Sequence, residues 1–216
     1  MKKQLTILIL TCLTFSTSKS LAQIAVKQKV DYSALDVPLN FSDTSSVSIF
    51  IIDNRVQVLD KSQEEDFVGY IRSLVGIAWP IRTKSGAPFS NELSSSIANS
   101  FTKQGLKASF FPVLISDTLG MILDKANTAG TDKAIVMTLR KWHTECYFTV
   151  WIDYDINLSI YDSNHEKLLS KDFYAAGKEL GGEKESRKFK EFLPQATGKE
   201  LSIIFNDTEL VSAFTK

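Results

Sequence analysis

The sequence predicts an α+β protein with a mixed, largely antiparallel sheet, a long C-terminal three-stranded meander, and two or three helices packed on it. Three observations support this fold class. Residues 134–176 alternate between apolar and polar side chains as strands do, two amphipathic helical patterns precede them, and a third helical pattern follows. Strands separated by helices and then continued as a meander are typical of a sheet with helices on one face.

The first 22 residues have the features of a secretory signal peptide. Two lysines precede an apolar run over residues 5–15, and Ser20 and Ala22 place small side chains at −3 and −1 of a cleavage site. We therefore expect residues 1–22 to be removed and residues 23–216 to form a single extracytoplasmic α+β domain.

The same leader predicts an exported protein in the periplasm or at the periphery of the outer membrane. Cys12 lies in the apolar run, but leucine stands two residues before it and threonine one residue before it, which does not fit a lipoprotein cleavage site. We do not expect lipidation at Cys12. No later stretch approaches the roughly 20 apolar residues of a membrane-spanning helix, so no transmembrane segment is expected in the mature chain.

Charge and cysteine content narrow the function classes. Removal of Lys2, Lys3 and Lys19 leaves 22 of the 25 basic residues against 25 acidic ones, a formal charge of −3. A nucleic-acid binder would show a concentrated basic face, so no nucleic-acid partner is expected. The mature chain keeps one cysteine, Cys146, which cannot form an internal disulfide. We therefore expect the hydrophobic core to hold the fold together.

Short strands are expected before the meander. Apolar or alternating runs predict them at residues 24–29, 47–52, 68–74, 76–82 and 108–114. The first is expected at an edge of the sheet. Pro80 and Pro112 cannot donate a ladder hydrogen bond, so the strands that contain them should lie at an edge or be irregular.

Three helical segments accompany these strands. Ser90 can cap a helix with the apolar stripe Leu93, Ile97 and Phe101, and Gly105 can end it. Asp117 can cap a second helix, which ends near Gly130 and has the apolar stripe Leu119, Ile122, Leu123 and Ala126. A closing helix is expected from about Leu193, with Asp207 capping a last turn.

The meander is expected to form the floor for the first two helices. Its turns are predicted at residues 144–146 and 162–165. In the middle strand, the even-numbered residues from Phe148 to Ile160 are almost all apolar and the odd-numbered ones are mostly polar. Because side chains of a strand alternate between faces, the even-numbered row should pack against both helical stripes and the odd-numbered row should meet water.

A family resemblance follows from the order of these elements. The strand over residues 47–52 ends in Asp53-Asn54-Arg55, the capped helix ends in Lys103-Gln104-Gly105-Leu106 before another strand, and residues 201–210 form a closing helix. This order resembles the YajG-like family of bacterial envelope lipoproteins over most of residues 47–214. The resemblance implies a compact extracytoplasmic module without established catalysis, although the cleavage site here lacks a lipidation signal.

Two groups of residues are weak candidates for catalysis. His143 and Cys146 lie three residues apart near the first turn, and an imidazolium beside a thiol would create a thiolate nucleophile. Asp153 and Asp155 share one face of a strand, as paired carboxylates do in some glycosidases. Neither pair has supporting motifs, and no spacing resembles a zinc site. We expect no catalytic residue, no metal site and no cofactor.

Recognition residues are the stronger candidates. We expect Trp142 and Trp151 to pair across the first turn, with Tyr147 beside them and Asp153 and Asp155 at the rim. The alternative is that the C-terminal helix covers this face and makes it core. The sequence thus predicts a non-enzymatic envelope-associated binding or accessory protein whose partner is an envelope protein or a glycan. The alternative function is a small periplasmic hydrolase or thiol enzyme that uses His143 and Cys146.

Overall fold

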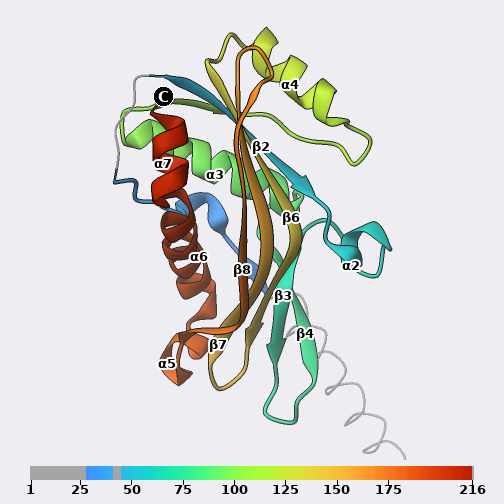
Figure 1. Cartoon of the computed structure of the whole chain (residues 1–216). Helices are drawn as coiled ribbons and strands as arrows, with labels where there is room; N and C mark the ends of the chain where they lie inside the picture. The colour runs from blue at the N-terminus through green and yellow to red at the C-terminus, as the bar shows by residue number, and fades with distance from the viewer. Residues whose placement is uncertain (1–27, 41–44, 216) are drawn as a thin grey trace, which may run out of the picture.

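The computed structural model describes residues 28–40 and 45–215, which fold around a long curled sheet flanked by helices (Figure 1). The predicted signal peptide and residues 24–27 of the predicted first strand lie outside the described residues. The strands are β1 (Lys29–Val30), β2 (Ser46–Asp53), β3 (Phe67–Arg72), β4 (Ala78–Thr83), β5 (Lys107–Phe110), β6 (Lys133–Cys146), β7 (Val150–Asp162) and β8 (Lys167–Gly181). The helices are η1 (Tyr32–Ala34), α2 (Val56–Leu59), α3 (Phe89–Lys103), α4 (Leu119–Thr128), α5 (Glu183–Arg187), α6 (Phe189–Phe205) and α7 (Thr208–Phe214).

The sheet is mixed, as the sequence predicts. Its described strands follow the order β1-β4-β3-β6-β2-β5, with β7 on β6 and β8 on β7. The meander β6–β7–β8 and the β3–β4 hairpin are antiparallel, whereas β2 and β3 pair in parallel with β6. Because β6 is 14 residues long, β2 pairs with its first half and β3 with its last three residues, so the two short strands follow one another along β6 (Figure 1).

The meander differs from the prediction in its first turn and in one bulge. The turn comprises residues 147–149 rather than 144–146, whereas the second turn, after Asp162, is close to its predicted position. Leu139 pairs with Ile156 and Lys141 with Asp155, so Arg140 is an additional residue in β6. A bulge of this kind reverses the side-chain alternation of the strand beyond it.

One face of the sheet carries the main core. The even-numbered row of β7 is buried, as predicted, and comprises Val150, Ile152, Tyr154, Ile156, Leu158 and Ile160. Helices α3, α6 and α7 pack on this row, and the rings of Phe101 and Phe205 meet edge to face at 5.1 Å. Phe148 belongs to the same row by alternation but lies in the turn, where it is 53% exposed.

Helix α4 packs on the opposite face of the sheet, which corrects the prediction that α3 and α4 pack on the same face. Its buried side chains Ile122 and Leu123 belong to a second cluster with Phe50, Ala126, Ala134, Val136 and Tyr161. These sheet residues alternate with Ile49 and Ile135, which belong to the main core. The amphipathic pattern of α4 is therefore confirmed, but the face that it covers is not the predicted one.

Helix boundaries also depart from the predicted caps. Helix α3 follows Pro88, and Ser90 is buried within its first turn instead of capping it. Thr118 caps α4, while Asp117 accepts hydrogen bonds from Leu114 N (2.9 Å) and Lys125 Nζ (2.7 Å). The predicted C-cap position of Gly105, with φ +94°, and the capping of α7 by Asp207 are confirmed.

Two more boundaries differ from the prediction. Helix α6 begins at Phe189 rather than near Leu193, so Pro194 lies inside it. Strand β5 ends at Phe110, four residues earlier than predicted. Among the described residues, none of the helices combines the length and apolar content that crossing a membrane requires.

An extended segment of residues 35–40, here called the strap, lies between α3 and α6. Its backbone is held by side chains of both helices: Ser100 Oγ accepts from Val37 N (2.7 Å), and Ser202 Oγ and Asn206 Nδ2 donate to Pro38 O (2.7 and 2.8 Å). Side-chain partners replace the ladder bonds that an isolated extended segment lacks. The strap thereby fixes the distance between the two helices.

Candidate functional site: the open sheet face

Part of the second sheet face is not covered by any helix of residues 28–40 and 45–215. Strand β7 has 13 residues and spans roughly 43 Å, whereas the 10 residues of α4 span roughly 15 Å. Helix α4 therefore covers only one end of this face, near Tyr161. We call the remainder the open face; it comprises Tyr70, Arg72, Arg140, Lys141, His143, Glu145, Trp151, Asp153, Asp155, Asn157, Asp172 and Tyr174.

Three aromatic side chains from adjacent strands lie in a row on the open face. The rings of Trp151 in β7 and His143 in β6 have centroids 5.9 Å apart, and those of His143 and Tyr70 in β3 are 5.6 Å apart. The loop after α2 reaches the edge of this row, where Gln63 Nε2 donates to Tyr70 Oη (2.9 Å). Trp151 is half-buried, so it offers part of its ring to a partner while its neighbours hold its position.

Glu145 connects this row to a basic side chain. Its carboxylate pairs with the Arg72 guanidinium and lies 3.4 Å from His143 Nε2. Burial alone would raise the pKa of Glu145, but hydrogen bonds from Arg72 and His143 outweigh burial and lower that pKa. Glu145 is therefore a fixed negative charge at the base of the aromatic row.

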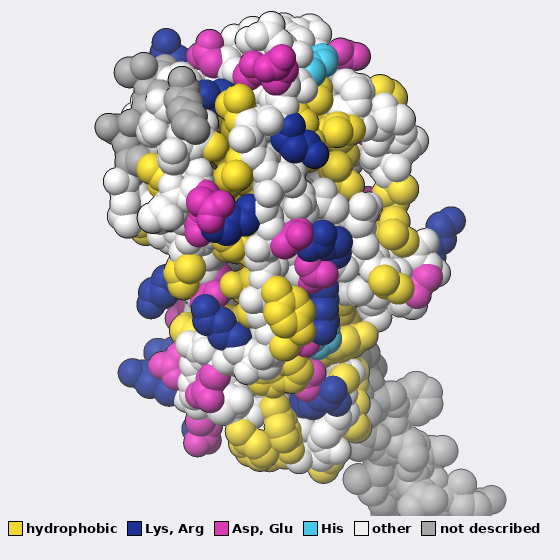
Figure 2. All heavy atoms as spheres, viewed as in Figure 1, with side chains coloured by type: hydrophobic (Ala, Val, Ile, Leu, Met, Phe, Trp, Pro, Cys, Tyr) yellow, Lys and Arg dark blue, Asp and Glu magenta, His cyan; other side chains and the backbone are white. Residues whose placement is uncertain are grey.

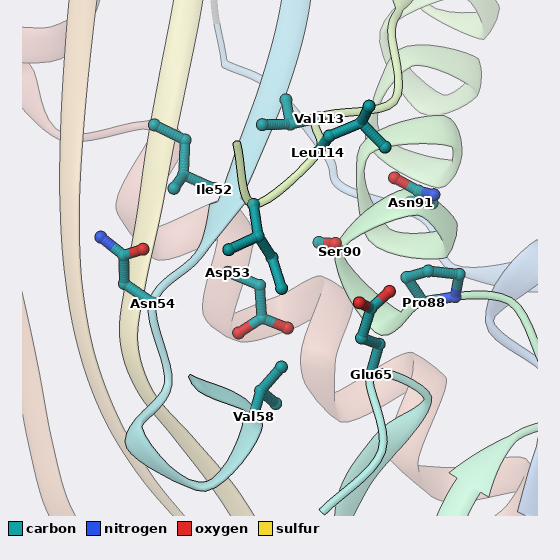
Figure 3. Close-up of a pocket in the computed structure, with 11 residues that line it drawn as sticks. Ile52, Asp53, Asn54, Val58, Glu65, Pro88, Ser90, Asn91, Val113 and Leu114 are labelled. Atoms are coloured by element: carbon teal, nitrogen blue, oxygen red, sulfur yellow. The ribbon is translucent and has the colours of Figure 1, made fainter. Parts of the chain in front are cut away.

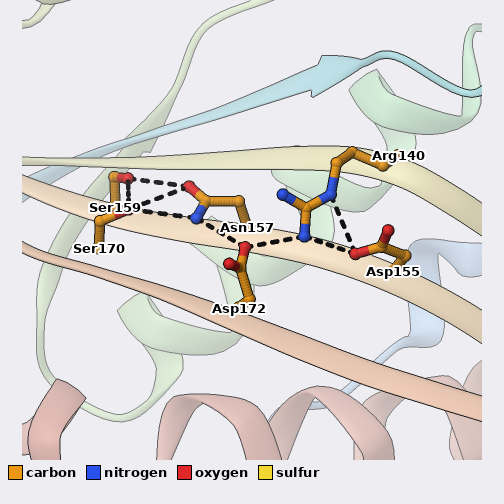
Figure 4. A network of polar contacts seen from close by, with 6 residues as sticks. All are labelled: Arg140, Asp155, Asn157, Ser159, Ser170 and Asp172. Carbon is orange, nitrogen blue, oxygen red and sulfur yellow. Dashed lines mark hydrogen bonds and ion pairs between the residues drawn. The ribbon is translucent and has the colours of Figure 1, made fainter.

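A polar network crosses β6, β7 and β8 on the same face (Figure 4). Arg140 Nε donates to Asp155 Oδ1 (2.9 Å), and Arg140 Nη2 donates to Asp172 Oδ1 (2.8 Å). Asn157 Nδ2 also donates to Asp172 (2.9 Å), and Ser159 and Ser170 complete the network. The hydrogen bonds from Asn157 and Arg140 lower the pKa of Asp172. The network keeps charged groups in fixed positions on a solvated surface.

The predicted binding residues Asp153 and Asp155 do lie on the open face, but each has an ion-pair partner. Asp153 accepts from Lys141 Nζ (2.9 Å) and from Gly177 N (2.6 Å). Burial acts to raise the pKa of Asp153, and these hydrogen bonds outweigh it and lower the pKa. Two carboxylates with separate cationic partners are suited to recognition and do not resemble an acid–base pair that shares a proton.

Trp142 does not lie on this face, which corrects the predicted Trp142–Trp151 pair. Because of the extra residue at Arg140, Trp142 pairs with Tyr154 and points into the main core, where it is fully buried. Its ring stacks on Tyr154 at 6.2 Å and contacts Phe89 at 5.6 Å. Trp151 instead pairs with Glu145. The C-terminal helices pack on the core face, so they do not cover Trp151.

Tyr147 lies in the turn between β6 and β7 rather than beside Trp151. Its hydroxyl donates to Leu74 O (3.1 Å), and its ring contacts Phe148 with centroids 4.1 Å apart. Tyr147 therefore belongs to the end of the sheet and not to the aromatic row.

The His143–Cys146 pair of the alternative prediction is not formed. The two residues differ by an odd number of positions in β6, so their side chains point to opposite faces of the sheet. Cys146 is fully buried in the main core, and burial raises the pKa of its thiol to about 12. A buried, protonated thiol without an imidazole neighbour is not a nucleophile.

A pocket of about 80 Å³ lies at the end of β2 (Figure 3). Asp53, Glu65, Ser90 and Asn91 line it together with apolar side chains such as Ile52 and Val113. The Asp53 carboxylate is already paired with the fully buried Arg55, at 2.6 and 2.8 Å, and Arg55 Nη1 also donates to Phe67 O (2.6 Å). This pair joins the end of β2 to the start of β3, so its role is structural.

No described side chains form a metal site. Within residues 28–40 and 45–215, no three His, Cys, Asp or Glu side chains come together in a group that could hold a metal ion.

Sequence reasoning missed Tyr70, Arg72 and Tyr174 as members of the open face. Tyr70 and Arg72 are in a predicted strand, but their position beside Glu145 depends on the parallel pairing of β3 with the end of β6. Tyr174 pairs with Asp155 and is 70% exposed. The alternation of the third meander strand was the one signal that could have placed it on the solvated side.

Comparison with known proteins gives only distant similarities. No protein-family model matches the chain, and no curated protein matches it. A DUF330-family protein from Xanthomonas campestris is similar in structure with a TM-score of 0.49 and 11% identity, covering 85% of this chain and 92% of that one. A hypothetical protein from Chlamydia trachomatis has a TM-score of 0.42 and 12% identity, with coverages of 80% and 96%.

A lipoprotein from Neisseria meningitidis is also similar, with a TM-score of 0.28 and 11% identity over 60% of this chain and 81% of that one. Similarities of this size establish neither a family nor a function for the chain. The YajG-like resemblance stays a prediction.

Proposed function

We propose that this protein is a non-enzymatic, envelope-associated binding module that receives a protein or glycan partner on the open face. One observation carries the proposal: Trp151 lies partly buried against His143, between ion-paired charges, on a face that the C-terminal helices do not cover. Aromatic side chains surrounded by fixed charged groups are typical of binding hot spots.

The geometry favours binding over catalysis. The carboxylates of Asp153, Asp155 and Asp172 each have a cationic partner, so they are held in place before a partner arrives. Pre-ordered side chains reduce the entropy that binding costs. A broad sheet surface of this kind suits an extended partner, such as a protein surface or a glycan chain, better than a small molecule.

The proposed localisation in the cell envelope rests on the sequence. The N-terminal leader predicts export. The resemblance to the YajG-like family rests on β2 with its Asp53-Asn54-Arg55 end, α3 followed by Gly105 and β5, and the closing helices α6 and α7. Membership in that family is part of the proposal.

Affinity capture from the native cell envelope tests the proposal. The parent, Trp151→Ala and a control, Phe110→Ala, are used as baits; Phe110 is 38% exposed on β5, far from Trp151 in the sheet order. We expect parent and control to retain the same partner and Trp151→Ala to lose about tenfold or more of it, as hot-spot truncations do. Protease treatment of the envelope extract separates a protein partner from a glycan. Equal capture by parent and Trp151→Ala would disprove the assignment of the open face.

A further inference from the structure

Strand β8 lies at one end of the sheet and has a long edge that no described strand pairs with. It is 15 residues long, and within residues 28–40 and 45–215 its one strand partner is β7. Figure 1 shows β8 near the viewer, with α6 and α7 to its left. We call the side of β8 that faces away from β7 the free edge. Such an edge presents backbone N–H and C=O groups that can pair with another chain.

The backbone groups on the free edge can be assigned to particular residues. Asp162 N donates to Glu166 O (3.0 Å) where β7 turns into β8, so the even-numbered residues of β7 direct their backbone groups toward β8. In the stretch Leu169–Ala175, the partners of these residues are the odd-numbered ones. The outward backbone groups therefore belong to the even-numbered residues of that stretch, which are Ser170, Asp172 and Tyr174.

The stretch Leu169–Ala175 lacks the features that usually protect a free edge. It contains no proline and no bulge, because its register with β7 is unbroken. Its two charged side chains are engaged within the molecule: Lys171 pairs with Asp207 at 2.9 Å, and Asp172 pairs with Arg140 at 2.8 Å. Charged side chains that point outward keep other strands away from an edge, and these two do not.

Two other charged residues of β8 have no ion-pair partner in the described part of the chain. Lys167 and Glu179 lie near opposite ends of the strand, and both are exposed. Lys167 pairs across the ladder with Tyr161 and Glu179 with Trp151, which are both odd-numbered residues of β7, so the two charges lie on the same face of the sheet. Figure 2 shows charged side chains of both signs along this strip of the surface.

We propose that β8 pairs with β8 of a second copy of this chain, antiparallel and about a two-fold axis at Phe173. An axis perpendicular to the sheet brings two identical edges together and keeps equivalent faces on the same side. With the axis at Phe173, Asp172 of each copy lies opposite Tyr174 of the other. The outward backbone groups of these residues then form two hydrogen-bonded pairs.

The same register brings the unpaired charges together. Glu179 lies six residues after Phe173 and Lys167 lies six residues before it, and each interval contains one additional residue where β8 bulges against β7. Lys167 of each copy therefore lies opposite Glu179 of the other, on the same face, so two ion pairs form. No like charges lie opposite each other in this register. This charge complementarity favours a second copy over an unrelated extended peptide.

The dimer has a consequence for the open face, although it does not depend on what that face binds. Each open face reaches the free edge through Asp172 and Tyr174, so the dimer joins two open faces into one surface. Because each copy uses the same edge, the two-fold pairing closes at two copies and does not continue into a filament.

Sedimentation equilibrium of the mature chain tests the proposal. The paired edges are short, so we expect a monomer–dimer equilibrium with a dissociation constant between about 10 µM and about 1 mM. Glu179→Lys places like charges opposite each other twice and should weaken the dimer about tenfold or more. Glu179→Lys combined with Lys167→Glu restores opposite charges and should return the dissociation constant to within about threefold of the parent value.

Glu64→Lys is the matched control for the reversed charge. It changes the net charge by the same amount at an exposed acid that has no ion-pair partner among the described residues. Glu64 precedes β3, which β6 and β7 separate from β8. The control should dimerise as the parent does.

A second variant tests the backbone pairing. Tyr174→Pro removes an outward N–H, so it should abolish the dimer while the ladder to β7 keeps its hydrogen bonds. Circular dichroism verifies that the variant folds. If it does not fold, amide hydrogen exchange of the parent takes its place: the Tyr174 N–H should exchange more slowly as the protein concentration rises, whereas the Phe173 N–H, which faces β7, should not.

Four results would overturn the proposal. The parent could stay monomeric at about 1 mM, the weak end of specific association. Glu179→Lys could dimerise as tightly as the parent, or the double reversal could fail to recover the dimer. Exchange of the Tyr174 N–H could be independent of protein concentration. None of these measurements involves a ligand of the open face, so they are separate from the test of the proposed function.

Discussion

Gly198 in α6 offers a substitution whose effect runs against the usual rule for helices. Replacing a glycine inside a helix with alanine ordinarily stabilises it by about 1 kcal/mol, because alanine restricts the unfolded chain. At this position an added Cβ would lie 2.0 Å from the carbonyl oxygen of Asp36 in the strap, and real Cβ atoms essentially never approach closer than 3.0 Å. Alanine at residue 198 therefore requires the strap or α6 to move by about 1 Å.

That movement should lower the free energy of unfolding by an amount that follows from the contacts it breaks. A shift of about 1 Å would break the two hydrogen bonds that Ser202 and Asn206 donate to Pro38 O, each contributing about 1 kcal/mol. Overpacking of a buried site costs a further 1–3 kcal/mol or so. After the gain in helix propensity is subtracted, we expect Gly198→Ala to lower the free energy of unfolding by about 2–4 kcal/mol, and the melting temperature by about 5–15 °C.

Urea unfolding followed by circular dichroism measures this difference. The matched control is Gly120→Ala in α4, where the nearest atom to an added Cβ is Thr118 Oγ1 at 3.9 Å. We expect the control to be as stable as the parent or up to about 1 kcal/mol more stable. If Gly198→Ala is as stable as the parent, or more so, the close contact between the strap and α6 is wrong.

Three further predictions concern buried groups. Phe101→Asp places an uncompensated charge against Phe205 and should lower the free energy of unfolding by more than about 3 kcal/mol; a thermal melt like that of the parent would contradict the packing of α3. Burial acts to raise the pKa of Glu145, but hydrogen bonds from Arg72 and His143 hold it below its ordinary value of 4.5. The ionised Glu145 therefore contributes fully to the free energy of unfolding above that pH, and this contribution is lost as the pH falls below it. The stability difference between the parent and Glu145→Gln should shrink accordingly in urea titrations at decreasing pH, and a constant difference would refute this linkage. With a pKa of about 12, the Cys146 thiol of the folded protein should react with Ellman's reagent at neutral pH at least about a hundredfold more slowly than glutathione, and quickly in urea; fast labelling of the folded protein would show that the thiol is accessible.

Local patterns in the sequence determined the kinds of element and most of their positions. The stripe of Leu93, Ile97 and Phe101 predicts a helix and its buried side, and α3 has both. The even-numbered row of the middle meander strand predicts a buried face, and β7 has it from Val150 onward. These predictions hold because periods of 3.6 and 2 residues are properties of a single helix or strand and do not depend on what lies beside it.

The candidate site was predicted only in part, and one residue accounts for much of the difference. Trp151, Asp153 and Asp155 share the solvated face of β7, as the alternation predicts. Trp142 was expected beside Trp151 because a first turn at residues 144–146 would pair the two side chains across it, whereas the turn comprises residues 147–149. The bulge at Arg140 turns Trp142 into the core and His143 toward Trp151 instead. A bulge depends on how two strands pair, so neither strand reveals it alone.

By itself, the sequence determined that this protein has a long meander with one apolar face and amphipathic helices to cover it, whereas the N-terminal signal peptide stays a prediction. The tertiary structure alone decided which face each helix covers and which part of the sheet stays open. Helix α4 packs on the face opposite α3 and is too short to cover the length of β7, so no described helix covers the surface around Trp151. The physical reason is that an amphipathic stripe specifies that a helix must bury one side, whereas the partner of that side is set by contacts between distant segments.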